Sequence, residues 1–600
     1  MRRIFIHAVY LVIFSIGLAA QEHHYTFLGA GNHEGITVTA SGFIGNSTPD
    51  KTINGSGLDA KFMEASRFLC QAGFGGKKEE IEEVMEMGFE NWIEDQFNKP
   101  NELMVPIIDQ IMHEIFHALD SIGEDTTEYF GPWGIHFNYA WWTRLMAHDD
   151  VLRLKVAQAL SEILVISMNS EILNFGRGAA SYYDMLLRNA FGNYKDLLME
   201  VTLHPMMGYY LSHYNNPKTD TVENIRPDEN YAREIMQLFT IGLYELDIDG
   251  TPILDSEGKP IPTYDNNDIK EFAKVFTGLG MGEVEYNREW PPYPIFGPPI
   301  YFAEKTVPMA MYEDYHEPGE KYLLNGFVVP AGQSGMQDVA DAVDHLFNHP
   351  NVGPFLAYRL IQRLVKSNPT PAYVARVASA FNDNGQGVRG DMKAVVKAIL
   401  LDEEARSADW FSDPSNGMIR PPLYRLAHLF KTIDLIYPYP GRYWNNGWDI
   451  LDEVKHHPLG SPTVFNFYPP NFQPIGPLYQ EGLVSPEMKI HNTAASVRYI
   501  NRIFMHTFWE TAWWSWENGE IDDPVEIDYS YYENISDDPE YLINELDKLL
   551  THGNLSDDTR QIIRDNLAEF YWTWDDWWRY FRARMAVYLI MISPDYVTFK

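Results

Sequence analysis

Apolar residues recur every three or four positions along most of the chain, with polar residues between them, and this pattern predicts amphipathic helices. Segments 106–119 and 150–166 are clear examples, and similar patterns cover 81–97, 182–202 and 229–244. The alternation of apolar and polar positions that indicates a strand is sparse. The pattern therefore predicts an all-α fold, a large multi-helix body with irregular loops.

The first 57 residues differ from this pattern. Residues 1–20 begin Met-Arg-Arg, continue as an apolar run and end in two alanines, which is the layout of a secretory signal peptide. Residues 21–57 are rich in Gly, Thr, Ser and Asn, and a short alternating piece predicts an extended, β-like arm. We assign residues 58–600 to the helical domain, with a second lobe from about residue 541 as the alternative to a single body.

The signal peptide predicts export to the periplasm or the extracellular space. Its apolar run is short for a membrane span, and no later stretch is long and apolar enough for one. We therefore expect no stable membrane span after cleavage.

The chain carries 84 acidic against 46 basic residues, a formal charge of -38. Such a charge repels phosphate backbones and anionic lipid surfaces, so nucleic acid is not an expected partner. The one cysteine, Cys70, excludes an internal disulfide framework and a thiolate zinc cluster. The sequence also lacks a Walker loop, a dinucleotide-binding fingerprint and a G-x-S-x-G motif.

One motif suggests a metal site. His113, Glu114 and His117 form H-E-x-x-H in a segment predicted to be helical, and histidines four positions apart share one helix face. Two imidazoles can bind zinc while the glutamate acts as a base toward bound water. The downstream ligands of the longer metzincin pattern are missing, and both histidines fall on the polar side of the helix. A solvated polar face is therefore the alternative interpretation.

A second polar cluster lies at the predicted start of a helix. Glu229 with Arg233, and Asn230 with Glu234, are spaced four positions apart and so share helix faces. Such a cluster forms either a structural network or a ligand-binding site.

Loops hold further candidates. His316 and Lys321 lie in an irregular stretch, where amphipathicity does not explain polar residues. His136 and His204 also belong to short motifs that we expect in loops, and a single histidine in such a position is more often structural than a ligand.

Tryptophans are abundant, and several of the sixteen cluster near residues 509–516 and 572–578. Indole faces beside acidic groups are typical of sugar-binding grooves. Their helical spacing near 574–581 equally fits an aromatic core.

The order of several motifs resembles a bacterial family known as domain of unknown function 1800. The motifs are Arg67-Phe68-Leu69-x-Gln71-Ala72-x-Phe74-Gly75, Leu152-Arg153-x-x-Val156-Ala157-x-Ala159-Leu160-Ser161-Glu162-Ile163, Asn189-Ala190-Phe191-Gly192-Asn193-Tyr194, His204-Pro205-x-Met207-Gly208, Glu229-Asn230-Tyr231-Ala232-Arg233-Glu234, Phe276-Thr277-Gly278, His316-x-x-Gly319-x-Lys321, Leu360-Ile361-Gln362-Arg363-Leu364-Val365, Arg389-Gly390-Asp391, Pro462-Thr463-Val464-Phe465-Asn466-Phe467-Tyr468-x-Pro470 and Ser593-Pro594-Asp595-Tyr596. They run collinearly over nearly the whole mature chain.

The resemblance implies a secreted or periplasmic helical protein without an assigned activity, often encoded beside a sulfatase-like companion protein. It favours Glu229, Glu234, His316 and His204 as catalytic residues, and Asn230, Arg233 and Lys321 as substrate-binding residues. We add the loop candidate His136, which is not part of the family motifs, to the expected substrate-binding residues. Here Glu229 or Glu234 would act as a base or metal ligand, His316 as an acid/base or ligand, and Arg233 and Lys321 as anion holders.

Three functions remain open. The first is a hydrolytic or polysaccharide-processing enzyme, and the second is a non-enzymatic glycan-binding or assembly protein. The third is a zinc metallohydrolase that uses His113, His117 and Glu114, with zinc as its divalent metal cofactor.

Overall fold

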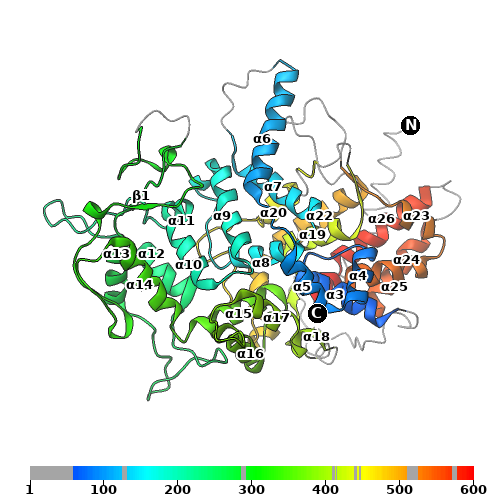
Figure 1. Ribbon diagram of the computed structural model, residues 1–600. Coiled ribbons are helices and arrows are strands. Elements are labelled where there is room, and N and C mark those ends of the chain that lie inside the picture. Colours follow the sequence, from blue (N-terminus) through cyan, green and yellow to red (C-terminus); the bar gives the residue numbers. More distant parts are fainter. Residues whose placement is uncertain are drawn as a thin grey trace.

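The computed structural model describes residues 58–123, 131–285, 292–407, 413, 415–437, 442–444, 448–509, 525–570 and 577–600 (Figure 1). Helices dominate this part of the chain, which confirms the mainly helical prediction. The predicted signal peptide and extended arm, 1–57, lie outside the described residues, and so do most of the predicted tryptophan clusters. None of the described helices combines the length and apolar character that a bilayer crossing requires.

The N-terminal part is a series of closely packed helices. They are α3 (Ala60–Ala72), α4 (Lys78–Met87), α5 (Phe89–Asn98), α6 (Met104–Ser121), α7 (Gly134–Ala147), α8 (Val151–Ser161), α9 (Gly176–Asn189), α10 (Tyr194–Leu203) and α11 (Pro205–Tyr210). Every residue of α8 is buried, including Arg153, Lys155 and Gln158, so this helix lies at the centre of the core with its polar side chains enclosed. By contrast, α6 projects from the body (Figure 1) and buries only one face, the predicted apolar stripe from Ile108 to Leu119.

Two predicted helices are each divided in the structure. The segment 81–97 is interrupted at Gly88, which has φ 78° and separates α4 from α5; this left-handed conformation ends a helix at little cost only for glycine. The segment 182–202 is divided between α9 and α10, where the Asn193 side chain accepts a hydrogen bond from the Lys195 backbone and starts the second helix.

The middle of the chain alternates helices with long loops. The helices are α12 (Asn230–Glu234), a π-helix (Ile235–Thr240), α13 (Asn266–Val275), α14 (Gly335–Phe347), α15 (Val352–Leu364), α16 (Pro371–Asn382), α17 (Met392–Leu400) and α18 (Glu403–Arg406). Helices α12 to α14 lie at one end of the molecule in Figure 1, opposite the C-terminal helices. The loops carry two antiparallel pairs, β1 (Leu279–Gly280) with β2 (Ala310–Met311) and β3 (Lys321–Tyr322) with β4 (Val328–Val329).

The C-terminal part adds further helices to the same core. They are α19 (Pro422–Thr432), α20 (Trp448–Val454), α21 (Pro477–Gln480), α22 (Thr493–Phe508), α23 (Ser530–Ile535), α24 (Pro539–Leu546), a second π-helix (Asp547–Thr551), α25 (Asp557–Ala568), α26 (Trp577–Ile592) and α27 (Pro594–Val597). Two more antiparallel pairs are β5 (Met418–Ile419) with β8 (Thr598–Phe599) and β6 (Leu435–Ile436) with β7 (Glu526–Ile527). Buried apolar residues from Phe62 to Tyr596 form one continuous cluster, which includes residues on both sides of the proposed boundary near 541.

Candidate functional site

Helix α12 begins with a locally capped polar turn. The Asp228 carboxylate accepts a hydrogen bond from the Asn230 backbone, and Glu229 lies at the N-terminal boundary of the helix. Glu229 and Arg233 form the predicted i,i+4 pair, with 3.8 Å between Oε2 and Nη2 and both side chains about 40% exposed (42% and 41%). An ion pair this exposed contributes little stability. Glu229, Asn230 and Arg233 are all at least partly exposed and form an accessible polar surface.

Glu234, at the end of α12, is in a different environment. Its residue is only 4% exposed, and its Oε2 atom is buried without a hydrogen-bond partner among the described residues. Burial raises the pKa of this carboxyl to about 7, although the positive charge of Arg233 opposes the shift. The helix then continues as the π-helix Ile235–Thr240, a geometry that often occurs at functional sites. Glu234 is therefore a buried carboxyl group whose Oε2 atom has no hydrogen-bond partner among the described residues that would account for it as a structural residue.

The loop candidates His316 and Lys321 belong to a buried ion cluster that also contains Asp338 of α14. The His316 ring places Nδ1 2.9 Å from the Thr277 carbonyl oxygen and Nε2 3.0 Å from Asp338 Oδ2. Lys321 Nζ forms an ion pair with the same carboxylate oxygen. Burial alone would raise the pKa of Asp338, but hydrogen bonds from His316 and Lys321 outweigh it and lower the pKa.

This Asp338 cluster (His316, Lys321 and Asp338) fastens the loop to α14. Lys321 Nζ also donates to the Glu317 and Gly319 carbonyl oxygens, at 2.6 and 3.1 Å. Gly278 packs closely against this loop. Its φ is +82°, and a Cβ at this position would lie 3.0 Å from the backbone nitrogen of His316, so only glycine fits there without a shift. No hydrogen bond or ion pair of the described residues joins the cluster to Glu234 or Arg233, so the two predicted halves of the site are not directly connected.

Asp338 was not identified from the sequence, although a signal for it exists. It lies in the first turn of an amphipathic helix, on the face that also carries Val339 and Ala342. A carboxylate on an apolar face requires a buried cation, and the nearby loop supplies two cationic side-chain types.

His204 caps a helix. Its Nδ1 accepts a hydrogen bond from the Met206 backbone at 3.2 Å, and its Nε2 lies 3.3 Å from Ser181 Oγ. Burial is the main cause that lowers the pKa of His204 to about 3, so the ring is neutral at neutral pH. This hydrogen bond positions α11. Because the ring is neutral, it is not an imidazolium that could act as a general acid.

We expect His204→Ala to lower the free energy of unfolding by about 0.5–2 kcal/mol, because the N-terminal amide groups of α11 lose their side-chain acceptor. His204→Asn, which retains a capping oxygen, should lose less. Urea denaturation of both variants measures the difference, and equal losses would contradict the capping role.

His136 is fully buried at the start of α7. Its Nδ1 accepts a hydrogen bond from the Trp133 backbone at 2.9 Å, and its ring packs near Trp133 and Tyr139. These contacts give it a local structural role at the helix start.

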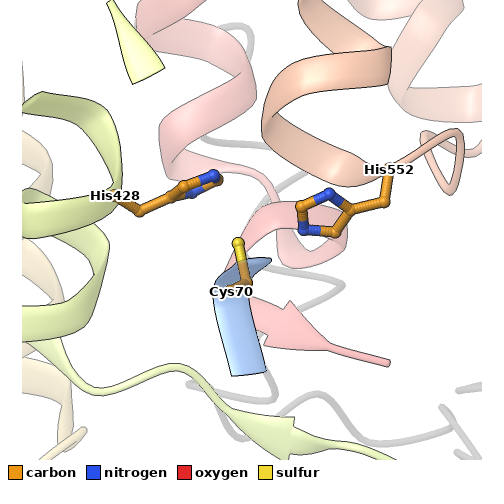
Figure 2. Close-up of side chains that lie close together, drawn as sticks. All are labelled: Cys70, His428 and His552. Carbon is orange, nitrogen blue, oxygen red and sulfur yellow. The ribbon is translucent and has the colours of Figure 1, made fainter. Parts of the chain in front are cut away.

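The H-E-x-x-H histidines are exposed on the solvent side of α6. Glu114 accepts a hydrogen bond from Gln110 at 2.9 Å and forms an ion pair with Arg442 at 3.2 Å. Among the described residues, the group with suitable ligand spacing lies elsewhere: Cys70, His428 and His552, whose potential ligand atoms are within 4.8 Å of one another (Figure 2). The zinc prediction for His113 and His117 thus gains no third ligand from the described part of the chain.

The core contains a polar network that the sequence interpretation did not identify as a site. Glu162, just after α8, forms a buried ion pair with Arg363 of α15 at 3.0 Å. Burial favours the neutral guanidine, but the nearby Tyr468, Glu162 and Glu487 outweigh it and raise the pKa of Arg363. Four side chains donate hydrogen bonds to the Glu162 carboxylate: Gln158 Nε2 at 3.2 Å, Tyr468 Oη at 3.3 Å, Asn466 Nδ2 at 3.4 Å and Tyr424 Oη at 3.5 Å.

The sequence did hold a signal for this network. Glu162, Arg363, Asn466 and Tyr468 all lie in the motifs that carry the family resemblance. The sequence alone does not show that these segments, which are far apart along the chain, lie next to one another in the fold.

A family model described as "Protein of unknown function (DUF1800)" matches residues 67–598. The chain belongs to the DUF1800 family. No curated protein and no solved structure matches it. The DUF1800 match includes Glu234, the Asp338 cluster and the Glu162 network, so all three features lie within the family region.

Proposed function

We propose that this DUF1800 protein is an exported hydrolase in which Glu234 transfers a proton during bond cleavage, with polysaccharides as the substrate class. The observation that carries the proposal is the buried Glu234 carboxyl, whose Oε2 has no hydrogen-bond partner among the described residues. A structural carboxylate is normally paired when it is buried, whereas a proton-transferring carboxyl must keep an atom available.

The acidity of Glu234 suits this role. A pKa of about 7 leaves both protonation states populated at neutral pH, so the group can donate a proton to a leaving oxygen and accept one from water. Glu229 and Arg233 on the same short helix provide an accessible polar surface for substrate hydroxyl groups.

Two tyrosines support the substrate class. Burial is the main cause that raises the pKa values of Tyr210 and Tyr264, and the negative charge of Glu234 adds to both shifts, so both phenols lie within its electrostatic reach. Both side chains are half-buried, and Tyr264 donates a hydrogen bond to Gln237 at 2.8 Å. Aromatic faces beside a carboxyl are a common setting for sugar binding.

The remaining predicted residues have supporting roles in this proposal. His316 and Lys321 hold their loop through Asp338, and His204 positions α11. Export of the protein rests on its predicted signal peptide.

The test compares Glu234→Gln with wild type on a glycan panel, using release of reducing ends as the readout. We expect kcat to fall by about 10²–10⁴-fold, because the amide cannot transfer the proton. The alkaline limb of the wild-type pH profile, near pH 7, should also disappear. Glu223→Gln is the matched control, since Glu223 is exposed and lies shortly before the same helix; it should retain wild-type activity.

Stability gives a second readout that needs no substrate. The folded-state pKa of Glu234 is above its ordinary value of 4.5, so folding is favoured at low pH, and this contribution is lost as pH rises from about 4.5 through about 7. Glu234→Gln should flatten this part of the stability curve. A folded Glu234→Gln variant with wild-type activity and pH profile would overturn the proposal, and glycan binding without cleavage by wild type would favour the non-enzymatic alternative.

A further inference from the structure

A small cavity lies between α3, α8, α15 and α19, away from α12. Its volume is about 20 Å³, and its polar lining comes from Cys70, Lys155, Arg363, Arg420, Tyr424 and His428. A cavity of this size holds one water molecule or a small ion. The unusual feature is its charge, because three of these six side chains are cationic.

Lys155 has no acidic partner in the described part of the chain. Its residue is 2% exposed; its Nζ donates to the Cys70 carbonyl oxygen at 3.1 Å and lies 3.9 Å from the centre of the Tyr424 ring. The carboxylate whose charge reaches it, Glu162, is already ion-paired with Arg363. Burial lowers the pKa of Lys155 to about 7, while Cys70 and Glu162 oppose the shift.

Arg420 likewise forms no ion pair among the described residues. It is 5% exposed and donates to His428 Nδ1 at 2.9 Å and to His552 Nε2 at 3.4 Å. Its guanidinium group also lies 4.4 Å from the centre of the Tyr596 ring. Arg420 and the protonated form of Lys155 thus place two buried positive charges at one cavity without a carboxylate to balance them, and uncompensated buried charge is costly.

A metal ion does not fit this environment. Figure 2 shows the Cys70 sulfur between the His428 and His552 rings, and their potential ligand atoms lie within 4.8 Å of one another. Arg420, however, uses a ring nitrogen of each histidine as a hydrogen-bond acceptor and holds a fixed positive charge against both rings. A divalent cation there would compete for those lone pairs and face strong repulsion.

The Cys70 thiol does not provide the missing negative charge. Burial raises the pKa of Cys70, although Arg420 and Lys155 oppose this. The thiol therefore stays protonated at neutral pH, and Arg420 and the protonated form of Lys155 remain without a counterion among the described residues.

We propose that this cavity binds a compact monovalent anion, of the size of a halide ion or a single carboxylate group, between Lys155 and Arg420. The anion balances the two buried charges, and the small volume excludes larger anions such as gluconate. The site is separate from Glu234 and does not depend on the proposed hydrolase activity.

The test measures the thermal unfolding temperature of the mature protein as sodium gluconate is replaced by sodium bromide or sodium formate at constant ionic strength. We expect a saturable rise with the small anion in wild type, because a ligand that binds only the folded state stabilises it. Lys155→Met and Arg420→Gln should abolish the rise. Lys61→Met, on the exposed face of α3, and Cys70→Ser should retain it.

Lys155→Met gives a second signature. In gluconate this variant should unfold at the same temperature as wild type or higher, because it removes an unbalanced buried charge. In bromide the unfolding temperature of wild type should rise relative to that of the variant. Bromide-soaked wild-type crystals should show an anomalous peak within hydrogen-bonding distance of Lys155 and Arg420.

The arms of the experiment distinguish the sources of the anion. A rise with formate alone identifies the carboxylate of an organic ligand, and a rise with both probes identifies any compact anion; either supports the proposal. No saturable rise in wild type, or an equal rise in Lys155→Met and Arg420→Gln, would overturn it. Stoichiometric zinc binding that is lost in Cys70→Ser would also overturn it.

Discussion

Asp338→Asn is expected to lower the free energy of unfolding by about 3–5 kcal/mol, because it leaves a buried cation without its counter-charge. Lys321 is 1% exposed and forms its ion pair only with this carboxylate among the described residues, and His316 directs Nε2 to the same oxygen. The amide keeps the shape of the side chain but not its charge. Urea denaturation at pH 7 measures the loss.

The matched control is Asp341→Asn, one turn along the same helix. Asp341 is half-exposed and accepts hydrogen bonds from two glutamine side chains, so we expect a change within about 1 kcal/mol. Equal losses at the two positions would show that the Asp338 cluster adds nothing beyond an ordinary surface contact.

The pH dependence has a defined sign. The folded-state pKa of Asp338 is below its ordinary value of 3.8, so its stabilisation is present above about pH 4 and is lost as pH falls through the folded-state pKa. Asp338→Asn should therefore lose less stability than wild type between pH 4 and pH 2.

Arg363→Met is expected to cost a similar amount, about 3–5 kcal/mol at pH 8, because it leaves two buried carboxylates without their cation. Arg363 lies 3.0 Å from Glu162 and 3.9 Å from Glu487, and both acidic side chains are almost completely buried. Methionine fills much of the same space without charge. Denaturant unfolding at several pH values measures the loss.

This loss should shrink in acid. Burial is the main cause that raises the pKa of Glu487 to about 7, and Arg363 opposes the shift. Without Arg363 the pKa of Glu487 rises further, so the variant regains stability as the Glu487 carboxyl protonates, and the deficit at pH 5 should be smaller than at pH 8.

Two further variants isolate the interaction. Arg376→Met removes an ion pair at 2.7 Å whose arginine is 45% exposed, and we expect a change within about 1 kcal/mol. Glu162→Gln combined with Arg363→Met should be more stable than Arg363→Met alone, because one buried charge is removed with its partner. A double variant that is less stable than the single one would contradict this account.

Several local features were predictable because they depend on neighbours in the sequence. The apolar stripe of α6 matches its buried face, and His113 and His117 lie on the exposed side, as the helical period requires. The Glu229–Arg233 pair also follows from spacing on one helix. Family membership was evident for a similar reason, since collinear motifs are a property of the chain itself.

The surroundings of each polar side chain were not predictable in this way. Lys321 pairs with Asp338, which lies 17 residues further along the chain. Glu162 contacts Arg363 and Tyr468, which lie roughly 200 and 300 residues further along, so no local rule connects these pairs. His316 and Glu234 looked equivalent as sequence candidates. In the structure His316 is buried with hydrogen-bond partners, whereas Glu234 is buried with no hydrogen-bond partner for Oε2 among the described residues.

The sequence by itself thus determined the helical character, the amphipathic faces and the family, because periodicity and motif order are recorded along the chain. Only the tertiary structure decided which charges are paired. That decision depends on desolvation and on distances between residues far apart in sequence, as in the unbalanced cations Lys155 and Arg420, which the fold brings to one cavity from α8 and from the segment before α19.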